Sequence, residues 1–270
     1  MRVPGWRRAV LAVAATAALS AAGIVGTATP AAADGCYTWQ RTLREGRTGA
    51  DVRQLQIRVA GWGGYGGTVV IDGIYGPRTA AAVGRFQAAY GLRVDGIAGR
   101  QTYRTLYELQ DDDCTPAHFS YLELDDGCGG SGWDGGPLSP SATRANALRM
   151  MWKLEALRRS LGDHPLFVTS GFRSRWCNAR VGGATRSQHL YGFAVDLVSP
   201  RIGLCALARE ARSHGFSGIL GPGYPGHGTH VHLDAGTENP ANRESRYWYA
   251  PTCGFTGPLS PAGSPPRQDP

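Results

Sequence analysis

Apolar residues in the first half of the chain recur at the spacing of short helices. Positions three to four apart are apolar in "ADVRQLQIRVAG" from Ala50 and again in "TAAAVGRFQAAYGL" from Thr79. Residues at this spacing share one face of a helix. The pattern predicts a small all-α domain in which three short helices pack together.

A sequence repeat supports the prediction of a separate helical domain. "DGIYGPRT" begins at Asp72 and "DGIAGRQT" at Asp95, and helix-like sequence follows each copy. Asp-Gly favours a turn, and the threonine falls near the start of the following helix. Each copy is therefore predicted to be a turn that begins a helix.

The second half of the chain combines apolar patterns typical of helices with patterns typical of strands. Residues 141–161 predict a long amphipathic helix with an apolar face of Ala147, Met150, Met151, Leu154, Leu157 and Leu161. Strands are predicted in "PLFVTSG", "FAVDLVS", "SGIL" and "HVHLD", and a helix in "ALAREARSHG". This order predicts an α+β domain with a small antiparallel-type sheet.

Composition adds the segments outside these domains. Residues 1–33 have a basic start, an apolar middle and a final A-x-A, which is typical of a signal peptide cut after Ala33. We divide the rest into a helical domain (34–114), a linker and domain entry (115–140), an α+β domain (141–254) and a disordered proline-rich tail (255–270).

Charge and cysteines limit the possible partners. Formal net charge is +7, and removal of the signal peptide with its three arginines leaves +4 without a basic stripe, so no nucleic-acid partner is expected. We expect an exported monomer that does not remain in a membrane after signal cleavage. Six cysteines in an exported chain predict three disulfides. Of fifteen pairings, we favour the sequential one: Cys36 with Cys114, Cys128 with Cys177, and Cys205 with Cys253.

Four of the seven histidines occur in two motifs. "SQHLYGFAVDL" contains His189 and Asp196, and "HGTHVHLD" contains His227, His230 and His232. In a strand His230 and His232 point to one face. His189 and Asp196 are an odd number of residues apart, so in one straight strand they would point to opposite faces. A bend between them would bring them together, and Gly192 is suited to it. Two imidazoles and one carboxylate suit Zn²⁺ and leave a fourth position for water.

At this point a family resemblance can be stated. "SQHLYGFAVDL" with "HVH" resembles the zinc D-alanyl-D-alanine carboxypeptidases and their endopeptidase relatives, which share a fold with the hedgehog signalling domain. "GADVRQLQ" and the two repeats resemble a peptidoglycan-binding domain. The resemblance implies one Zn²⁺ held by His189, Asp196 and His232, with peptidoglycan stem peptides as substrate. It also implies that Arg173, in "SGFRSRWC", grips the terminal carboxylate, with Arg175 and Arg186 as nearby competitors.

The chain departs from the family at one position. Members usually carry an acid three residues before the last zinc ligand, and Thr229 stands there. A threonine cannot exchange protons near neutral pH, so we assign His230 as the acid/base and His227 as a supporting electrostatic group. Release of the terminal D-alanine is the leading activity. An endopeptidase and a wall-binding protein with weak or no activity remain as alternatives.

Overall fold

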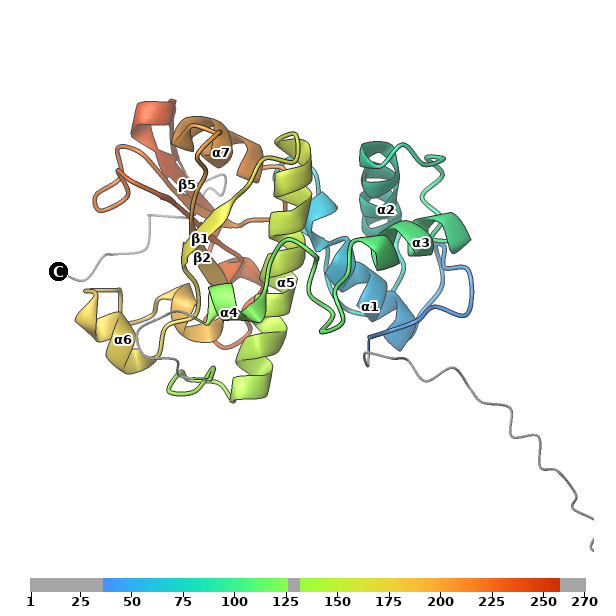
Figure 1. The fold of residues 1–270 in the computed structure, drawn as a ribbon, viewed down its shortest axis with the longest axis horizontal. Coiled ribbons are helices and arrows are strands. Elements are labelled where there is room, and N and C mark those ends of the chain that lie inside the picture. Colours follow the sequence, from blue (N-terminus) through green and yellow to red (C-terminus); the bar gives the residue numbers. More distant parts are fainter. Residues whose placement is uncertain (1–35, 126–131, 258–270) are drawn as a thin grey trace, which may run out of the picture. The chain divides into compact units, whose positions relative to one another are not determined.

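The computed structural model describes residues 36–125 and 132–257 (Figure 1). The predicted signal peptide lies outside the described residues, and so does Cys128. No helix in the described part of the chain is long and apolar enough to cross a membrane.

The first domain contains helices α1 (Ala50–Arg58), α2 (Pro77–Ala89) and α3 (Arg100–Glu108), with a 3-10 turn η1 (Ala60–Trp62) after α1. The predicted apolar positions of α1 and α2 are buried in a shared core. Cys36 and Cys114 form the predicted disulfide across this domain.

The sequence repeat is also a structural repeat. In the first copy, the amide of Gln56 donates to Asp72 at 2.9 Å and its oxygen accepts from the Gly73 N–H at 2.8 Å. In the second copy, Gln87 makes the same two bonds to Asp95 and Gly96 at 3.0 and 2.9 Å. A glutamine from the preceding helix thus fixes each Asp-Gly turn, and α2 or α3 begins directly after it, as predicted.

The long predicted helix is α5 (Pro140–Ser160), which contacts both cores. Its predicted face packs against the sheet, while Trp152 and Ala156 on another side join the core of the first domain. The described residues of the predicted linker and domain entry, 115–125 and 132–140, include α4 (Tyr121–Leu124), and Phe119 and Leu124 are buried in the second core.

The second domain is built on a six-stranded sheet in the order β1-β2-β4-β3-β5-β6. The strands are β1 (Phe167–Ser170), β2 (Ala194–Val198), β3 (Gly218–Leu220), β4 (Val231–Asp234), β5 (Tyr247–Ala250) and β6 (Phe255–Gly257). The expected antiparallel-type sheet is confirmed only in part: the sheet is mixed, because β3 and β5 are parallel while the other pairs of neighbouring strands are antiparallel. The chain leaves β4, passes through η3 (Gly236–Glu238) and returns on the far side of β3, which fixes the direction of β5.

Two strands were not predicted. β5 has the sequence YWYA, with three consecutive aromatic residues and no polar alternation, and it runs directly into a proline at the turn η4 (Pro251–Cys253). β6 occupies the first three residues of the predicted disordered tail, and the rest of the tail lies outside the described residues. Cys253 between these strands forms the predicted disulfide with Cys205, which belongs to α7 (Leu204–Ala211).

One face of the sheet packs on α5 and α7 (Figure 1). Val195 and Leu197 of β2 and Val231 and Leu233 of β4 are fully buried in that core. Because side chains alternate along a strand, the even-numbered residues of β2 and β4 face the other side. These even-numbered residues include Asp196, His232 and Asp234, so the second face of the sheet is polar, and the candidate site lies on it.

Candidate metal centre and active site

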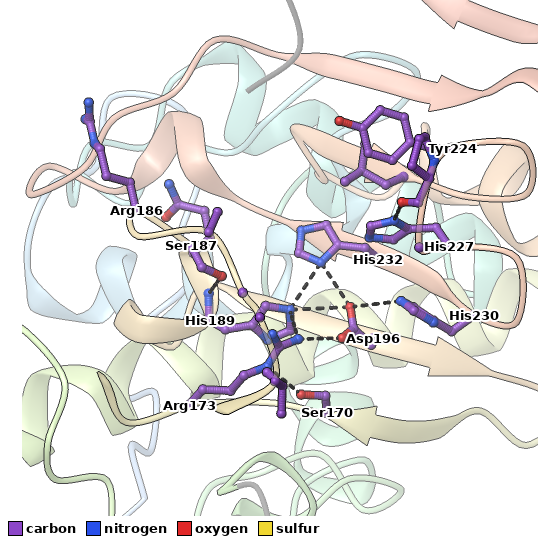
Figure 2. Close-up of a pocket in the computed structure, with 18 of the residues that line it drawn as sticks. Ser170, Arg173, Arg186, Ser187, His189, Asp196, Tyr224, His227, His230 and His232 are labelled. Atoms are coloured by element: carbon purple, nitrogen blue, oxygen red, sulfur yellow. Dashed lines mark hydrogen bonds and ion pairs between the residues drawn. The ribbon is translucent and has the colours of Figure 1, made fainter. Parts of the chain in front are cut away.

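A pocket with a volume of about 1100 Å³ lies over the polar face of the sheet (Figure 2). Asp196 of β2 and His232 of β4 line it together with Leu220 of β3. The loop before β2 supplies His189, and the loop before β4 supplies His227 and His230 in "GPGYPGHGTHVH". The two histidine motifs therefore meet in one cavity.

Strand register brings the first two of these side chains together. Asp196 is the direct partner of His232 in the antiparallel pairing of β2 with β4. Directly opposed residues on one face have Cβ atoms only about 5 Å apart. Asp196 Oδ1 accordingly lies 3.0 Å from His232 Nδ1.

His189 reaches the same point from a turn. It lies on the short 3-10 helix η2 (Gln188–Tyr191), which ends at Gly192 with φ +71°. A Cβ at Gly192 would also lie 2.6 Å from the Thr143 carbonyl oxygen, so the bend predicted at this glycine requires glycine for two reasons. His189 Nδ1 donates to the Gly171 carbonyl at 2.6 Å, which leaves the lone pair of Nε2 for the pocket.

The three side chains form what we call the His-Asp cluster: His189, Asp196 and His232. All three are buried, and one ligand atom of each lies within 4.8 Å of the others. His189 Nε2 is 3.2 Å from His232 Nδ1 and 3.3 Å from Asp196 Oδ1. Two imidazoles and a carboxylate this close are a possible metal site.

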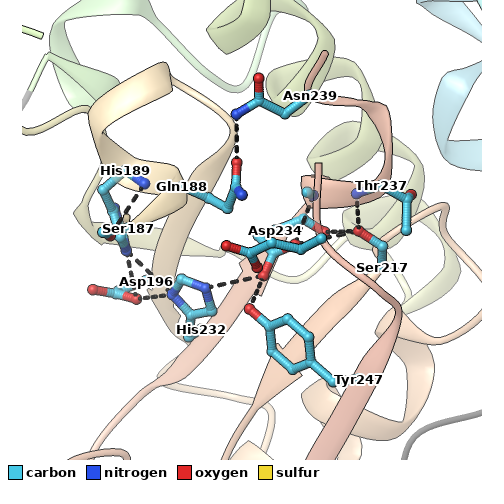
Figure 3. Close-up of polar contacts among 12 residues, drawn as sticks. Ser187, Gln188, His189, Asp196, Ser217, His232, Asp234, Thr237, Asn239 and Tyr247 are labelled. Atoms are coloured by element: carbon cyan, nitrogen blue, oxygen red, sulfur yellow. Dashed lines mark hydrogen bonds and ion pairs between the residues drawn. The ribbon is translucent and has the colours of Figure 1, made fainter. Parts of the chain in front are cut away.

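A further layer of contacts orients His232 (Figure 3). Its Nε2 lies 3.3 Å from Oδ2 of Asp234, which is fully buried. Asp234 in turn accepts hydrogen bonds from the Tyr247 hydroxyl, from Ser217 at 3.2 Å and from the Gly236 N–H at 2.8 Å. Nδ1 of His232 is thereby directed at the cluster.

These contacts also govern protonation. Burial works against a charged His232, but hydrogen bonds to Asp196 and Asp234 raise its pKa to about 9. Burial lowers the pKa of His189, and Asp196 opposes this only in part. Burial would raise the pKa of Asp196, yet His189 and His232 hold it well below its usual range. A cation is therefore strongly favoured beside this carboxylate.

The other two histidines of the second motif occupy the pocket wall. His230 precedes β4 and faces the same centre as His232, with its Nε2 3.8 Å from Asp196 Oδ1. The ring centroid of His227 lies 4.9 Å from that of His230. Burial lowers the pKa of both, to about 4 for His227, so His227 is neutral at neutral pH. Thr229 is exposed, and the described lining of the pocket does not include it.

Arg173 lines the pocket beside the cluster. Its Nη2 donates to Asp196 Oδ2 at 2.7 Å and to His189 Nε2 at 2.9 Å, and its Nε donates to Ser170 at 2.9 Å. Of the two competing arginines, Arg175 is exposed outside the pocket, whereas Arg186 lines it and bonds the amide oxygen of Asn242. Of these three arginines, Arg173 is the one with hydrogen bonds to the cluster in the described part of the chain.

Three residues of this site were absent from the sequence-based assignment. Asp234 lies beside His232 Nε2, and its partner Tyr247 belongs to the strand β5, which was not predicted. Glu244 lines the pocket, and burial together with the charge of Asp234 raises its pKa to about 7. For Asp234 the sequence offered one signal: it stands two residues after His232, so in a strand the two side chains share a face.

Fold and site together define a candidate metal-dependent enzyme, and comparison with known proteins agrees. The peptidase M15 family model matches residues 117–234, and the peptidoglycan binding domain model matches residues 48–106. The zinc D-Ala-D-Ala carboxypeptidase of Streptomyces albus G is 55% identical over 91% of this chain and 91% of its own length. The chain belongs to the peptidase M15 family.

Two further relatives match a shorter part of this chain. A spore cortex-lytic enzyme of Bacillus subtilis is 45% identical over 24% of this chain and 21% of its own length. An N-acetylmuramoyl-L-alanine amidase of Mycobacterium tuberculosis is 44% identical over 23% of this chain and 14% of its own length. Both matches, over 67 and 61 residues, are close in length to the 48–106 match of the peptidoglycan binding domain model.

Proposed function

We propose that this protein is a zinc-dependent carboxypeptidase that releases the terminal D-alanine from peptidoglycan stem peptides. The spacing of the His-Asp cluster carries the proposal. Tetrahedral Zn²⁺ with bonds near 2.0–2.1 Å keeps its ligand atoms about 3.3 Å apart. The three distances in the cluster are 3.0, 3.2 and 3.3 Å.

The donor set also suits Zn²⁺ chemically. His189 and His232 each make their second ring hydrogen bond, to Gly171 and Asp234, on the side away from the cluster. Such contacts fix the ring and the tautomer that a metal ligand needs. With Asp196 as the third ligand, one positive charge remains and one coordination position stays open. A bound Zn²⁺ would supply a Lewis acid for the scissile carbonyl and favour ionisation of water at neutral pH.

We assign proton transfer to His230. It faces the cluster from the pocket wall, and its lowered pKa leaves it neutral and able to accept a proton near pH 7. The proton that it accepts comes from the attacking water. His230 can then donate this proton to the amine of the departing D-alanine. The ring of His227 lies against that of His230. We propose that His227 stabilises the protonated form of His230 and does not exchange protons itself.

Arg173 is proposed to bind the terminal carboxylate of the substrate. A guanidinium binds a carboxylate at two points, which selects a free chain end over an internal peptide. In the structure Arg173 is paired with Asp196. When Asp196 coordinates the metal, we infer that Arg173 exchanges this partner for the substrate carboxylate.

The first domain is proposed to hold the enzyme on peptidoglycan, supported by its family match and by the wall-acting relatives that share it. Export by the predicted signal peptide would bring the chain to that substrate. The protein would then act outside the cell or in the wall.

The test is D-alanine release from a peptide ending in D-Ala-D-Ala, compared with the same peptide blocked by a C-terminal amide. We expect release from the free peptide and at least about a hundredfold lower kcat/KM for the blocked one, because Arg173 loses its partner. Equal cleavage of both would favour an endopeptidase. No cleavage of either by zinc-loaded protein would favour a wall-binding role.

A further inference from the structure

A second pocket, with a volume of about 350 Å³, lies away from the His-Asp cluster. Three arginines line it: Arg78 and Arg85 from α2, and Arg246 from the residue before β5. We call it the arginine pocket. Strand alternation separates it from the active site, because Tyr247 faces Asp234 and Arg246 therefore faces the opposite side of the sheet.

Helix geometry brings the first two arginines together. Arg78, Ala81 and Arg85 stand at positions i, i+3 and i+7 of α2, so they share one face. All three residues are exposed, which makes the pocket accessible from solvent. Ala81 between them has a small side chain, and Nη1 of Arg85 donates to the Trp62 carbonyl oxygen at 3.1 Å.

A glycine-rich loop forms the opposite wall. A Cβ at Gly63 would lie 2.5 Å from the carbonyl oxygen of Gly67, so this loop closes on itself only without side chains. Gly66, with φ +63°, is placed where a Cβ would lie 3.2 Å from Nη1 of Arg246. The loop therefore packs against Arg246 and restricts its position. Thr68, also in the lining, adds a hydroxyl donor.

The charge of the pocket is not balanced. Within the described residues, no ion pair includes Arg78, Arg85 or Arg246. Nε of Arg246 is buried and has no hydrogen-bond partner among them. A buried donor without a partner costs about 1–3 kcal/mol, and more when it is charged, so an acceptor in this pocket would be strongly favoured.

We propose that the arginine pocket binds a phosphate-type oxyanion. Three arginines and a threonine that line one pocket from separate elements suit a group with several acceptor oxygens and more than one direction of approach. A single carboxylate engages one guanidinium at two points and leaves the others unpaired. Inorganic phosphate and the phosphodiester of an anionic polymer both offer this chemistry, and a phosphodiester polymer would give the enzyme a second attachment to the wall.

The experiment is isothermal titration calorimetry on the full exported chain at fixed ionic strength, with inorganic phosphate in one arm and a glycerol-phosphate oligomer in the other. Arg246→Gln should weaken binding by about tenfold or more, since a charge-assisted bond is lost. Ala81→Glu should abolish binding, because it places a carboxylate between Arg78 and Arg85. Arg104→Gln, at an exposed position on α3, is the matched control and should leave binding unchanged; Ala81→Gln, which has the size of Ala81→Glu without its charge, should weaken binding less than Ala81→Glu.

Comparison of the two titrations distinguishes free phosphate from a phosphodiester polymer as the ligand. Tighter binding of the oligomer, per phosphate group, identifies a phosphodiester polymer, and equal or tighter binding of inorganic phosphate identifies the free ion. Ala81→Glu lies at an exposed helix position and keeps the test valid if Arg246→Gln does not fold. Absence of binding in both arms, or binding that Ala81→Glu and Arg246→Gln leave intact, would overturn the proposal. Peptidase activity is not part of the readout, so the outcome is independent of the proposed function.

Discussion

Asp234 Oδ2 lies 3.3 Å from Nε2 of His232, and this contact sets which nitrogen of His232 faces the His-Asp cluster. Asp234 is fully buried and is itself held by Tyr247, Ser217 and the Gly236 N–H. The geometry of the proposed metal site thus depends on residues that do not reach the metal. Asp234 is a positioning residue for His232.

Asp234→Asn should lower zinc affinity by about 10–100-fold, since a neutral amide orients the imidazole less well and weakens its basicity. Zinc affinity would be measured by competition with a chelator of known affinity. Tyr247→Phe is the matched variant, because it removes one of the donors to Asp234 and leaves the carboxylate, so a smaller loss is expected. Unchanged zinc affinity in a folded Asp234→Asn protein would show that the contact has no part in metal binding.

His230→Ala should lower kcat by about 10²–10⁴-fold while zinc content stays at one per chain, because the residue moves a proton and is not a ligand. His227→Ala should cost less, since His227 supports His230 without exchanging the proton. Steady-state kinetics and metal analysis on the same samples test both statements. A His230→Ala variant with full activity would refute the assignment of the acid/base.

Arg173→Gln should lower kcat/KM for the free peptide by at least about a hundredfold and bring it close to the value for the amide-blocked peptide. The change removes the proposed partner of the terminal carboxylate. Arg175→Gln, at an exposed position outside the pocket, is the control for the loss of one charge. If Arg173→Gln retained the preference for a free chain end, another group would have to provide the specificity.

Glu244 predicts a specific dependence of stability on pH. Burial and the charge of Asp234 raise its folded pKa from 4.5 to about 7. Between these values the folded state binds more protons than the unfolded chain, so the free energy of unfolding falls as pH rises. The contribution is complete below about pH 4.5 and is lost as pH passes through about 7.

Glu244→Gln should therefore flatten this pH dependence and raise the free energy of unfolding at pH 8 by roughly 1 kcal/mol, after allowance for partial exposure. Denaturant titrations at several pH values measure both quantities. Glu108→Gln, at an exposed position on α3, controls for the change in net charge. A pH profile unaffected by Glu244→Gln would contradict the raised pKa.

Much of this architecture follows from local sequence. The apolar face of α5, the two Asp-Gly turns and the four strands with alternating or continuous apolar residues were predictable, because each depends on periodicity or turn chemistry within a short segment. The meeting of the two histidine motifs was predictable from the parity of His230 and His232 and from the bend at Gly192. The structure places these residues in one pocket, while their chemical roles stay predictions.

The remainder depends on pairing between distant segments. β5 has no periodic signal of its own and is defined by its parallel pairing with β3. Without β5 there is no Tyr247 beside Asp234, so the buried position of Asp234 could not be recognised. Glu244 and the arginine pocket depend on the same strand and on the loop before it. The residues that the sequence did not reveal are therefore those whose environment is created by β5.

The most direct test of the account is a zinc titration of the metal-depleted protein, followed by D-alanine release from a peptide ending in D-Ala-D-Ala. We predict that activity is absent without metal and rises linearly until one Zn²⁺ per chain is bound. Asp196→Asn should bind no zinc and stay inactive, and Asp134→Asn, at an exposed position, should match the wild type. Activity in the depleted protein, or full activity and zinc binding in Asp196→Asn, would contradict the assignment of the His-Asp cluster as the metal centre.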